Sequence, residues 1–215
     1  STPEKMLALE CGGNNPLIVS SFNDINRVAE CLIKSAFLTS GQRCTSMRRL
    51  ILIRSSQMDS LLDCFLEQVA SLTIGSCEDE PEPFMGPLIS ATARDNYLNS
   101  IDVLGDAGGV CLVESKQSFD IGYFVTPTVF DVSNGYQDIP DVECFGPLLQ
   151  VIRVDSLEEA VLVANHTSYG LSASLISTSA QEFEYVYQHV RAGIINWNKP
   201  TNGASSQLPF GGIGR

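Results

Sequence analysis

Short apolar runs alternate with amphipathic helical periods along the whole chain. Apolar runs predict strands at 6–10, 16–20, 50–53, 109–113, 148–154, 171–177 and 193–198, with a further extended segment at 124–132. Between these runs, apolar residues recur every three or four positions, which predicts helices at 25–37, 56–72, 90–105, 156–166 and 180–190. Strands that alternate with helices are typical of an α/β domain with a largely parallel sheet. The sequence shows no internal repeat and no long linker, so we predict one domain over residues 1–215.

Several of these helices carry recognisable end signals. Asp24 and Ser156 are suitable N-caps for the helices that follow them, because their side-chain oxygens can accept a hydrogen bond from the first helical turn. Gly41 is a stop signal after the first helix. We therefore expect Cys44 in a loop directly after a well-anchored helix. The acidic, proline-broken stretch 77–87 is expected to be a solvated loop.

Composition indicates a folded protein with a substantial core. The chain has 215 residues, of which 44% are hydrophobic and 18% charged. Its net charge of −12 argues against nucleic acid or an anionic membrane surface as a partner. The chain contains neither an apolar run of 18 residues nor a signal peptide, so we expect no membrane association.

The number and spacing of the cysteines indicate which cellular compartment and which kinds of metal or disulfide site to expect. The seven cysteines include no C-x-x-C pair, and the chain has only two histidines, so no zinc site of the usual spacing is visible. A disulfide scaffold is also not expected in a chain of this size with a good core. Free thiols in a reducing, cytoplasmic compartment are the simplest expectation.

The stretch "GQRCTSMRR" at 41–49 places Cys44 among three arginines. A nucleophilic cysteine needs a base, and neither His166 nor His189 is well placed by sequence, since both fall near or within predicted helices. Glu10 is the alternative, at the end of a predicted strand and directly before "CGGNNP". A free cysteine is more often a small buried side chain than a nucleophile, so these residues alone leave both interpretations open.

Five motifs in order decide between those interpretations. The segments are "LECGGNNP" (9–16), "GQRCT" (41–45), "ECFGPLLQV" (143–151), "NHTSYGLSAS" (165–174) and "LPFGGIGR" (208–215). In this order they resemble the signatures of the aldehyde dehydrogenase superfamily, and the 34-residue step from Glu10 to Cys44 matches that family. A single Gly-Gly or a single cysteine is a weak signal, whereas five ordered motifs that span nearly the whole chain are highly specific.

The resemblance implies a fold and a set of roles. The fold would be the three-layer α/β/α catalytic domain of that family. Cys44 would attack the aldehyde carbon, and Glu10 would activate the water that hydrolyses the resulting thioester. The cofactor would be NAD, with NADP not excluded. The residues expected beside it are the backbone of Gly12 and Gly13, the carboxylate of Glu143 at the ribose, and the ring of Phe145 near the nicotinamide.

The chain also departs from the family pattern. In the family a nucleotide-binding domain precedes the position of Glu10, and an oligomerisation strand follows the Pro-Phe-Gly-Gly motif; neither is present in residues 1–215. We therefore expect these residues to form the catalytic domain, with little dehydrogenase activity by themselves. The full-length protein is expected to be a homo-oligomer.

Substrate choice depends on weaker signals. Arg43, Thr45 and Lys199 occupy positions that line the family's substrate tunnel, and the two cations suit a small anionic aldehyde. The motifs are most similar to those of semialdehyde dehydrogenases with carboxylate-bearing substrates. Alternatives are a dehydrogenase for succinate or glutamate semialdehyde, a Cys44-dependent acyltransferase or hydrolase, and a non-catalytic assembly module. Arg48 and Arg49 lead into the next strand, and we expect them to be structural.

Overall fold

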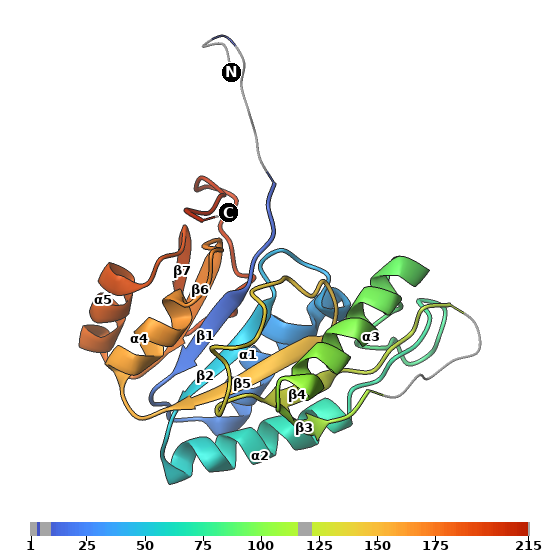
Figure 1. Ribbon diagram of the computed structural model, residues 1–215, viewed down its shortest axis with the longest axis horizontal. Helices are drawn as coiled ribbons and strands as arrows, with labels where there is room; N and C mark the ends of the chain where they lie inside the picture. Colours follow the sequence, from blue (N-terminus) through green and yellow to red (C-terminus); the bar gives the residue numbers. More distant parts are fainter. Residues whose placement is uncertain (1–3, 5–9, 116–121, 215) are drawn as a thin grey trace.

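The computed structural model describes residue 4 and residues 10–115 and 122–214. Within that part of the chain, one seven-stranded sheet runs through the molecule in the order β3-β4-β5-β2-β1-β6-β7 (Figure 1). All neighbouring strands are parallel except β3, which pairs antiparallel with β4 at one edge. The strands are β1 Asn15–Val19, β2 Met47–Ile53, β3 Val110–Val113, β4 Thr128–Asp131, β5 Leu148–Val154, β6 Ser172–Ile176 and β7 Ile194–Trp197.

Helices cover both faces of the sheet and confirm the predicted three-layer α/β/α architecture. On one face lie α1 (Ile25–Phe37) and α2 (Ser56–Ala70). On the other lie α3 (Ala91–Asp106), α4 (Leu157–Asn165) and α5 (Ala180–His189), as Figure 1 shows. Since the central strands are buried on both faces, they consist of continuous rather than alternating apolar residues. No helix among the described residues is long and apolar enough to cross a membrane.

Most predicted elements agree with the structure, and β5 agrees at both ends. Asp24 and Ser156 are N-caps as predicted, each accepting a hydrogen bond from the backbone N–H three residues later. The strand predicted at 50–53 begins earlier, at Met47, because Arg48 and Arg49 are buried strand residues. The strand predicted at 6–10 lies outside the described residues except for Glu10, which is in no strand.

The first helix ends earlier than its stop signal predicts. α1 ends at Phe37 and is followed by a short 3₁₀ turn, Leu38–Gly41. Thr39, Ser40 and Gly41 all have left-handed backbone angles, with φ of 58°, 55° and 67°. Gly41 is required there for a second reason, since a Cβ at this position would lie 2.4 Å from the carbonyl oxygen of Gly146. This reversal places Cys44 in a turn just before β2, as expected.

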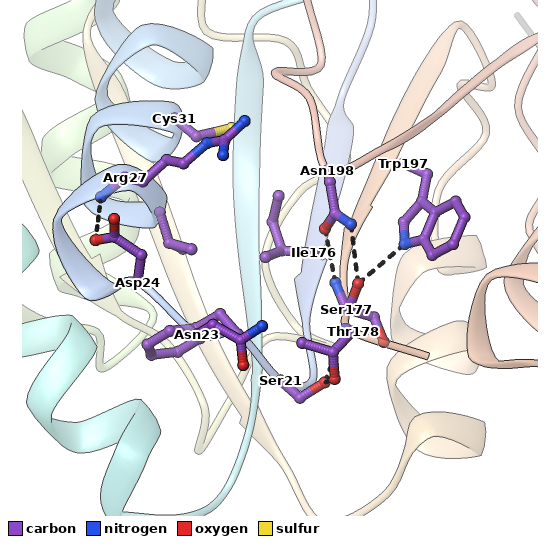
Figure 2. A pocket seen from close by; sticks show the side chains of 12 residues that line it. Ser21, Asn23, Asp24, Arg27, Cys31, Ile176, Ser177, Thr178, Trp197 and Asn198 are labelled. Atoms are coloured by element: carbon purple, nitrogen blue, oxygen red, sulfur yellow. Dashed lines mark hydrogen bonds between the residues drawn. The ribbon is translucent and has the colours of Figure 1, made fainter. Parts of the chain in front are cut away.

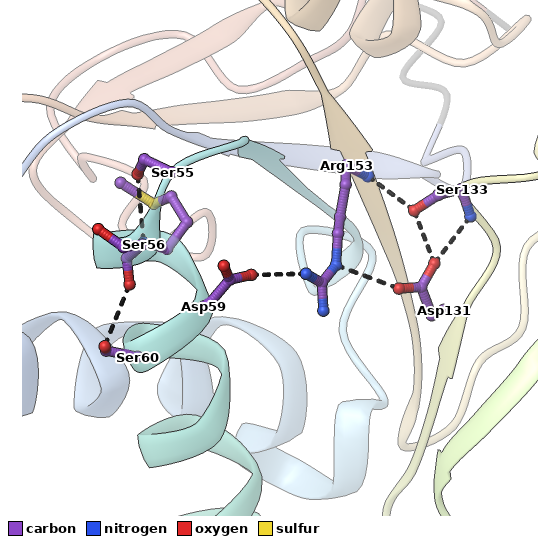
Figure 3. A network of polar contacts seen from close by, with 8 residues as sticks. Ser55, Ser56, Asp59, Ser60, Asp131, Ser133 and Arg153 are labelled. Carbon is purple, nitrogen blue, oxygen red and sulfur yellow. Dashed lines mark hydrogen bonds and ion pairs between the residues drawn. The ribbon is translucent and has the colours of Figure 1, made fainter.

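A polar network near the carboxyl ends of β4 and β5 joins these two strands to α2 (Figure 3). Arg153 of β5 donates a hydrogen bond from Nη1 to Asp59 Oδ1 of α2 at 2.7 Å. Its Nε lies 3.2 Å from Asp131 Oδ2, an ion-pair distance without the alignment of a hydrogen bond. Ser133 completes the network by donating to Asp131 Oδ1 and accepting from the backbone of Arg153. These contacts fix the helix against the sheet.

Candidate active site

The five sequence motifs meet at the amino ends of the parallel strands. The Gly-Gly segment precedes β1, the Cys44 turn precedes β2, and the Glu143 segment precedes β5. The fourth motif leads into β6, and its Gly170 carbonyl accepts a hydrogen bond from Ile213 N in the fifth motif at 3.1 Å. Segments up to about 200 positions apart in the sequence therefore form one continuous surface.

Asn15 holds the Cys44 turn against its neighbours. Its Nδ2 donates to the carbonyl oxygen of Cys44 at 2.7 Å and to that of Ser46 at 2.9 Å. Its Oδ1 accepts from Ser172 N at 3.0 Å, at the start of β6. Asn15 is only 2% exposed, so these three hydrogen bonds satisfy a buried amide that would otherwise be costly. The backbone of Cys44 is thereby fixed relative to two strands.

The paired glycines allow a close approach between the Cys44 turn and Glu143. Gly13 N donates to Glu143 Oε1 at 3.1 Å. A Cβ on Gly12 would lie 2.1 Å from Glu143 Oε2, and one on Gly13 would lie 2.4 Å from the carbonyl oxygen of Cys44. Only glycine permits this packing. The arrangement places Gly12, Gly13 and Glu143 together, as the resemblance implies.

These residues fit a nicotinamide cofactor. Glu143 engages the Gly13 N–H through one carboxylate oxygen, which leaves the other to accept from a ligand hydroxyl beside the open backbone of Gly12. Phe145 is 45% exposed at the same edge, so its ring face is accessible. Burial raises the pKa of Glu143, while the Gly13 N–H and the Arg48 guanidinium lower it.

Glu10 lies beside the fifth motif. It lines a pocket of about 160 Å³ together with Gly12, Leu171 and Phe210. Glu10 is exposed, and its charge is close enough to Cys44 to raise the pKa of the thiol. The pocket thus combines a carboxylate with an aromatic side chain and open glycine backbone, an arrangement suited to a small organic substrate.

The surroundings of Cys44 raise the pKa of its thiol. Burial raises its pKa most, and the carboxylates of Glu143 and Glu10 raise it further; the backbone N–H groups of Cys44 and Thr45 act in the opposite direction. A thiol with a raised pKa is a weak nucleophile until a base removes its proton. Glu10 is the candidate base, which agrees with the interpretation from the sequence.

The three residues predicted to bind the substrate differ in exposure and in their distance from the Cys44 turn. Arg43 is exposed next to Cys44, and its Nε donates to Thr39 Oγ1 at 2.9 Å. Thr45 is only 6% exposed, so its side chain lies behind the turn. Lys199 has an exposed side chain in the loop after β7, and its carbonyl accepts from Ser174 Oγ. None of its contacts among the described residues reaches the Cys44 turn.

A second and more voluminous pocket lies at the opposite ends of the strands. It has a volume of about 370 Å³ and is lined by residues that follow β1, β6 and β7 and by the start of α1 (Figure 2). In open α/β sheets ligands usually bind at the carboxyl ends of strands, and this pocket is at those ends. Its cysteine, Cys31, has a pKa raised to about 11 by burial, which makes it a poor nucleophile.

Sequence reasoning missed a second polar centre beside the site. Asp141 accepts hydrogen bonds from Asn14 Nδ2, Thr167 Oγ1, and both the backbone N–H and hydroxyl of Ser168, at 2.6–2.9 Å. Burial alone would raise its pKa, but these bonds outweigh burial and lower the pKa to about 2. Asn14 and Asn15, which follow the paired glycines, could have indicated such a centre. Two polar residues at the start of an apolar strand need hydrogen-bond partners when they are buried.

Arg48 and Arg49 are structural, as predicted, and are buried with 3% and 4% exposure. Arg49 donates five hydrogen bonds to the carbonyl oxygens of Asn14, Val163, Ala164 and His166. It therefore ties the end of α4 to the start of β1. All seven cysteines are free thiols.

Comparisons with known proteins agree with this geometry. The aldehyde dehydrogenase family matches residues 2–215. N-succinylglutamate 5-semialdehyde dehydrogenase from Novosphingobium aromaticivorans is 44% identical over 214 residues, covering 100% of this chain and 45% of that protein. The enzyme of the same name from Acinetobacter baylyi is 46% identical over 212 residues, covering 99% and 43%. The chain thus spans less than half the length of these relatives.

Solved structures share the fold. The 1-pyrroline-5-carboxylate dehydrogenase from Thermus with bound NAD is 32% identical with a TM-score of 0.86, covering 94% of this chain and 39% of that one. An NAD-dependent aldehyde dehydrogenase from Sinorhizobium meliloti is 27% identical with a TM-score of 0.88, covering 95% and 40%. The family match over nearly the whole chain, together with the five converging motifs, shows that this chain belongs to the aldehyde dehydrogenase family.

Proposed function

We propose that the protein oxidises an aldehyde to a carboxylate with a nicotinamide cofactor, using Cys44 as the nucleophile. The observation that carries this proposal is the junction of Cys44, the Gly12–Gly13 backbone and Glu143, held by the Gly13 hydrogen bond and by Asn15. Cys44 and Glu143 are 99 positions apart in the sequence, and both lie beside the paired glycines at the amino ends of the central strands, which supports their proposed roles as nucleophile and cofactor-binding carboxylate.

The residues suit a two-stage reaction. Glu10 removes the proton from the Cys44 thiol, either directly or through a water molecule, and the thiolate attacks the aldehyde carbon to form a thiohemiacetal. Loss of hydride gives a thioester on Cys44. Glu10 releases the first proton to solvent and then removes a proton from a water molecule as the water oxygen attacks the thioester carbon. The C–S bond breaks, the Cys44 thiolate takes that proton back from Glu10, and the product leaves as the carboxylic acid, which ionises in solution. NAD(P)⁺, when bound, supplies the hydride acceptor.

The residues that would hold the cofactor are those at the Glu143 junction. Glu143 would accept a hydrogen bond from the ribose, Gly12 and Gly13 would let the ligand approach the backbone, and Phe145 would pack near the nicotinamide. Water must be excluded from this edge before hydride leaves, and the exposed Phe145 ring is suited to that role.

We propose N-succinylglutamate 5-semialdehyde as the substrate, because the two relatives are named as dehydrogenases of that compound. Its oxidation would be a step of arginine catabolism. A polyanionic substrate needs cations in a protein whose net charge is −12. Arg43 is the candidate next to the nucleophile, and Lys199 is the second candidate. We also propose that the full-length protein is a homo-oligomer.

The first experiment tests the chemistry. With NAD⁺ and the aldehyde, the full-length protein should produce NADH, followed at 340 nm. Cys44→Ala should abolish NADH formation, whereas Cys77→Ala, which removes an exposed thiol of the acidic loop, should leave it unchanged. Glu10→Gln removes the base used in both stages, so NADH formation should fall by about 10²–10⁴-fold. Any thioester that still forms on Cys44 should persist long enough to be detected by mass spectrometry. Thioester turnover without cofactor, and no NADH from any aldehyde, would favour the acyltransferase alternative.

The second experiment tests the substrate. Lys199→Glu and Arg43→Glu should each raise KM for the succinylated semialdehyde by more than for a neutral aldehyde of similar length. Each charge reversal replaces an attraction with a repulsion toward substrate carboxylates. Equal changes for the two aldehydes would reject a carboxylate contact at that residue.

A further inference from the structure

A buried guanidinium beside the candidate site has no role in the mechanism above. Arg48 is 3% exposed and donates from Nη1 to Gly146 O at 2.8 Å. Its Nη2 donates to Gly41 O at 2.6 Å and to Arg43 O at 3.3 Å. Among the described residues its Nε has no hydrogen-bond partner. All its partners are neutral carbonyl groups.

These hydrogen bonds join the two halves of the site. Gly41 and Arg43 belong to the turn that carries Cys44, and Gly146 follows directly after Phe145. The Arg48 guanidinium carbon also lies 5.9 Å from the centre of the Phe145 ring, within the range of a cation–π contact. One side chain therefore fixes the nucleophile's turn relative to the segment that carries Glu143 and Phe145.

The charge of Arg48 is also uncompensated by any ion pair with a described carboxylate. Burial lowers the pKa of Arg48, and the anionic forms of Cys144, Glu143 and Cys44 raise it. In the reverse direction, Arg48 lowers the pKa of Cys144 and that of Glu143. The carboxylates of Glu143 and Glu10 raise the pKa of Cys44, and the Cys44 thiolate raises the pKa of Arg48.

We propose that Arg48 is a positioning residue that holds Cys44 and the Glu143–Phe145 segment at the separation needed for hydride transfer. The planar fork of arginine reaches carbonyls on both segments at once, which the single ammonium of lysine does not. The guanidinium binds the carbonyls of Gly41 and Arg43 in the Cys44 turn, and the Cys44 thiolate raises the pKa of Arg48, so the cation in turn favours the thiolate. This inference rests on the proposed function for its kinetic part only.

Arg49 supplies a matched control. Arg49 is adjacent to Arg48 in the sequence, is about as buried, and also donates hydrogen bonds only to carbonyl oxygens. Its partners are Val163 and Ala164 in α4, His166 just after that helix, and Asn14 just before β1, none of which belongs to the Cys44 turn. Loss of Arg49 therefore removes the same kind of buried interaction without separating the Cys44 turn from Gly146. Any effect common to both arginines reports stability, and an effect confined to Arg48 reports positioning.

The first test needs no cofactor and no substrate. Alkylation of Cys44 by iodoacetamide is followed by mass spectrometry across pH, with the exposed Cys77 as internal reference. Arg48→Met should move the Cys44 profile to higher pH by about half a unit or more, about a threefold lower rate at neutral pH. Arg48→Lys should stay close to wild type because the charge is kept, and Arg49→Lys should not move the profile.

The second test uses NAD⁺ and the aldehyde with the full-length protein. Arg48→Met and Arg48→Lys should both lower kcat by about tenfold or more, with KM changed less, since a displacement of about 1 Å costs up to 10²-fold. The primary isotope effect with a deuterated aldehyde should rise, which a general loss of stability does not produce. Arg49→Lys should lower the melting temperature without these kinetic changes.

The outcomes separate this inference from the proposed function. A folded Arg48→Met variant with a wild-type alkylation profile and kcat within twofold would overturn it, as would equal kinetic losses in Arg48→Lys and Arg49→Lys. If Arg48→Met does not fold, the kcat and isotope effect of Arg48→Lys decide the matter. A shifted profile in a protein that oxidises no aldehyde would support the action of Arg48 on Cys44 while rejecting the dehydrogenase.

Discussion

Two adjacent glycines at the site are required for different physical reasons. A side chain on Gly12 would displace the end of the Glu143 side chain, which is flexible. A side chain on Gly13 would collide with the backbone carbonyl of Cys44, which Asn15 holds in place. The first neighbour can move at little cost to the fold, and the second cannot.

Gly13→Ala should therefore lower the free energy of unfolding by about 1–3 kcal/mol, the range for forced overpacking. Gly12→Ala should change stability less and weaken cofactor binding, because the Glu143 carboxylate must move. Urea unfolding measures the first effect, and NAD⁺ titration of the full-length protein measures the second. Gly86→Ala is the control, since a Cβ there meets nothing within 4 Å. Equal unfolding midpoints for Gly13→Ala and Gly86→Ala would contradict the predicted collision.

At the scale of elements, short polar segments rather than helices and strands define the site. Asp141 joins the segment before β5 to the segment before β6 and to Asn14 before β1. Its hydrogen bonds favour the carboxylate and lower its pKa to about 2, despite the opposing effect of burial. Because the folded-state pKa lies below the ordinary value of 3.8, folding favours the ionised form.

The contribution of Asp141 to stability is thus fully present above about pH 4 and is lost as the pH falls toward 2. Asp141→Asn should lower stability at neutral pH and flatten its decline between pH 4 and 2, as measured by urea unfolding at a series of pH values. Asp138→Asn, three residues earlier, is the matched control and should keep the wild-type slope. A wild-type slope in Asp141→Asn would show that other carboxylates dominate acid unfolding.

At the scale of the whole molecule, the sheet separates two cores. Leu50 and Leu52 of β2 pack with α1 and α2, and Ile51 packs on the other face with α3, α4 and α5. Leu50 and Ile51 are both fully buried, so each truncation leaves a cavity. Residues next to each other in sequence therefore stabilise different layers.

Leu50→Ala and Ile51→Ala should each cost about 2–5 kcal/mol. Because their side chains lie on opposite faces and share no core cluster, the double variant should equal the sum within about 0.5 kcal/mol. Urea unfolding of the three variants tests this, with the slope of the transition checked for two-state behaviour. A large coupling energy would show that the two cores respond to truncation as one.

The positions of most elements, the fold class and the motifs could be predicted from the sequence alone. Hydrophobic periodicity is a local property, so it located the helices and the central strands, and the N-caps at Asp24 and Ser156 follow from side-chain chemistry within one turn. The stop signal at Gly41 lies four residues beyond the end of α1, because the chain reverses through left-handed backbone at Thr39, Ser40 and Gly41, and Gly41 there meets the Gly146 carbonyl across the fold.

Which of these residues meet became known from the folded structure. The Gly13–Glu143 hydrogen bond joins positions 130 apart, and Asn15 to Ser172 spans 157. No local pattern encodes such pairs, because they depend on the order of strands in the sheet. The same holds for Arg48: the sequence indicated a structural arginine, but its position between the Cys44 turn and Gly146 follows from placing β2 beside β5.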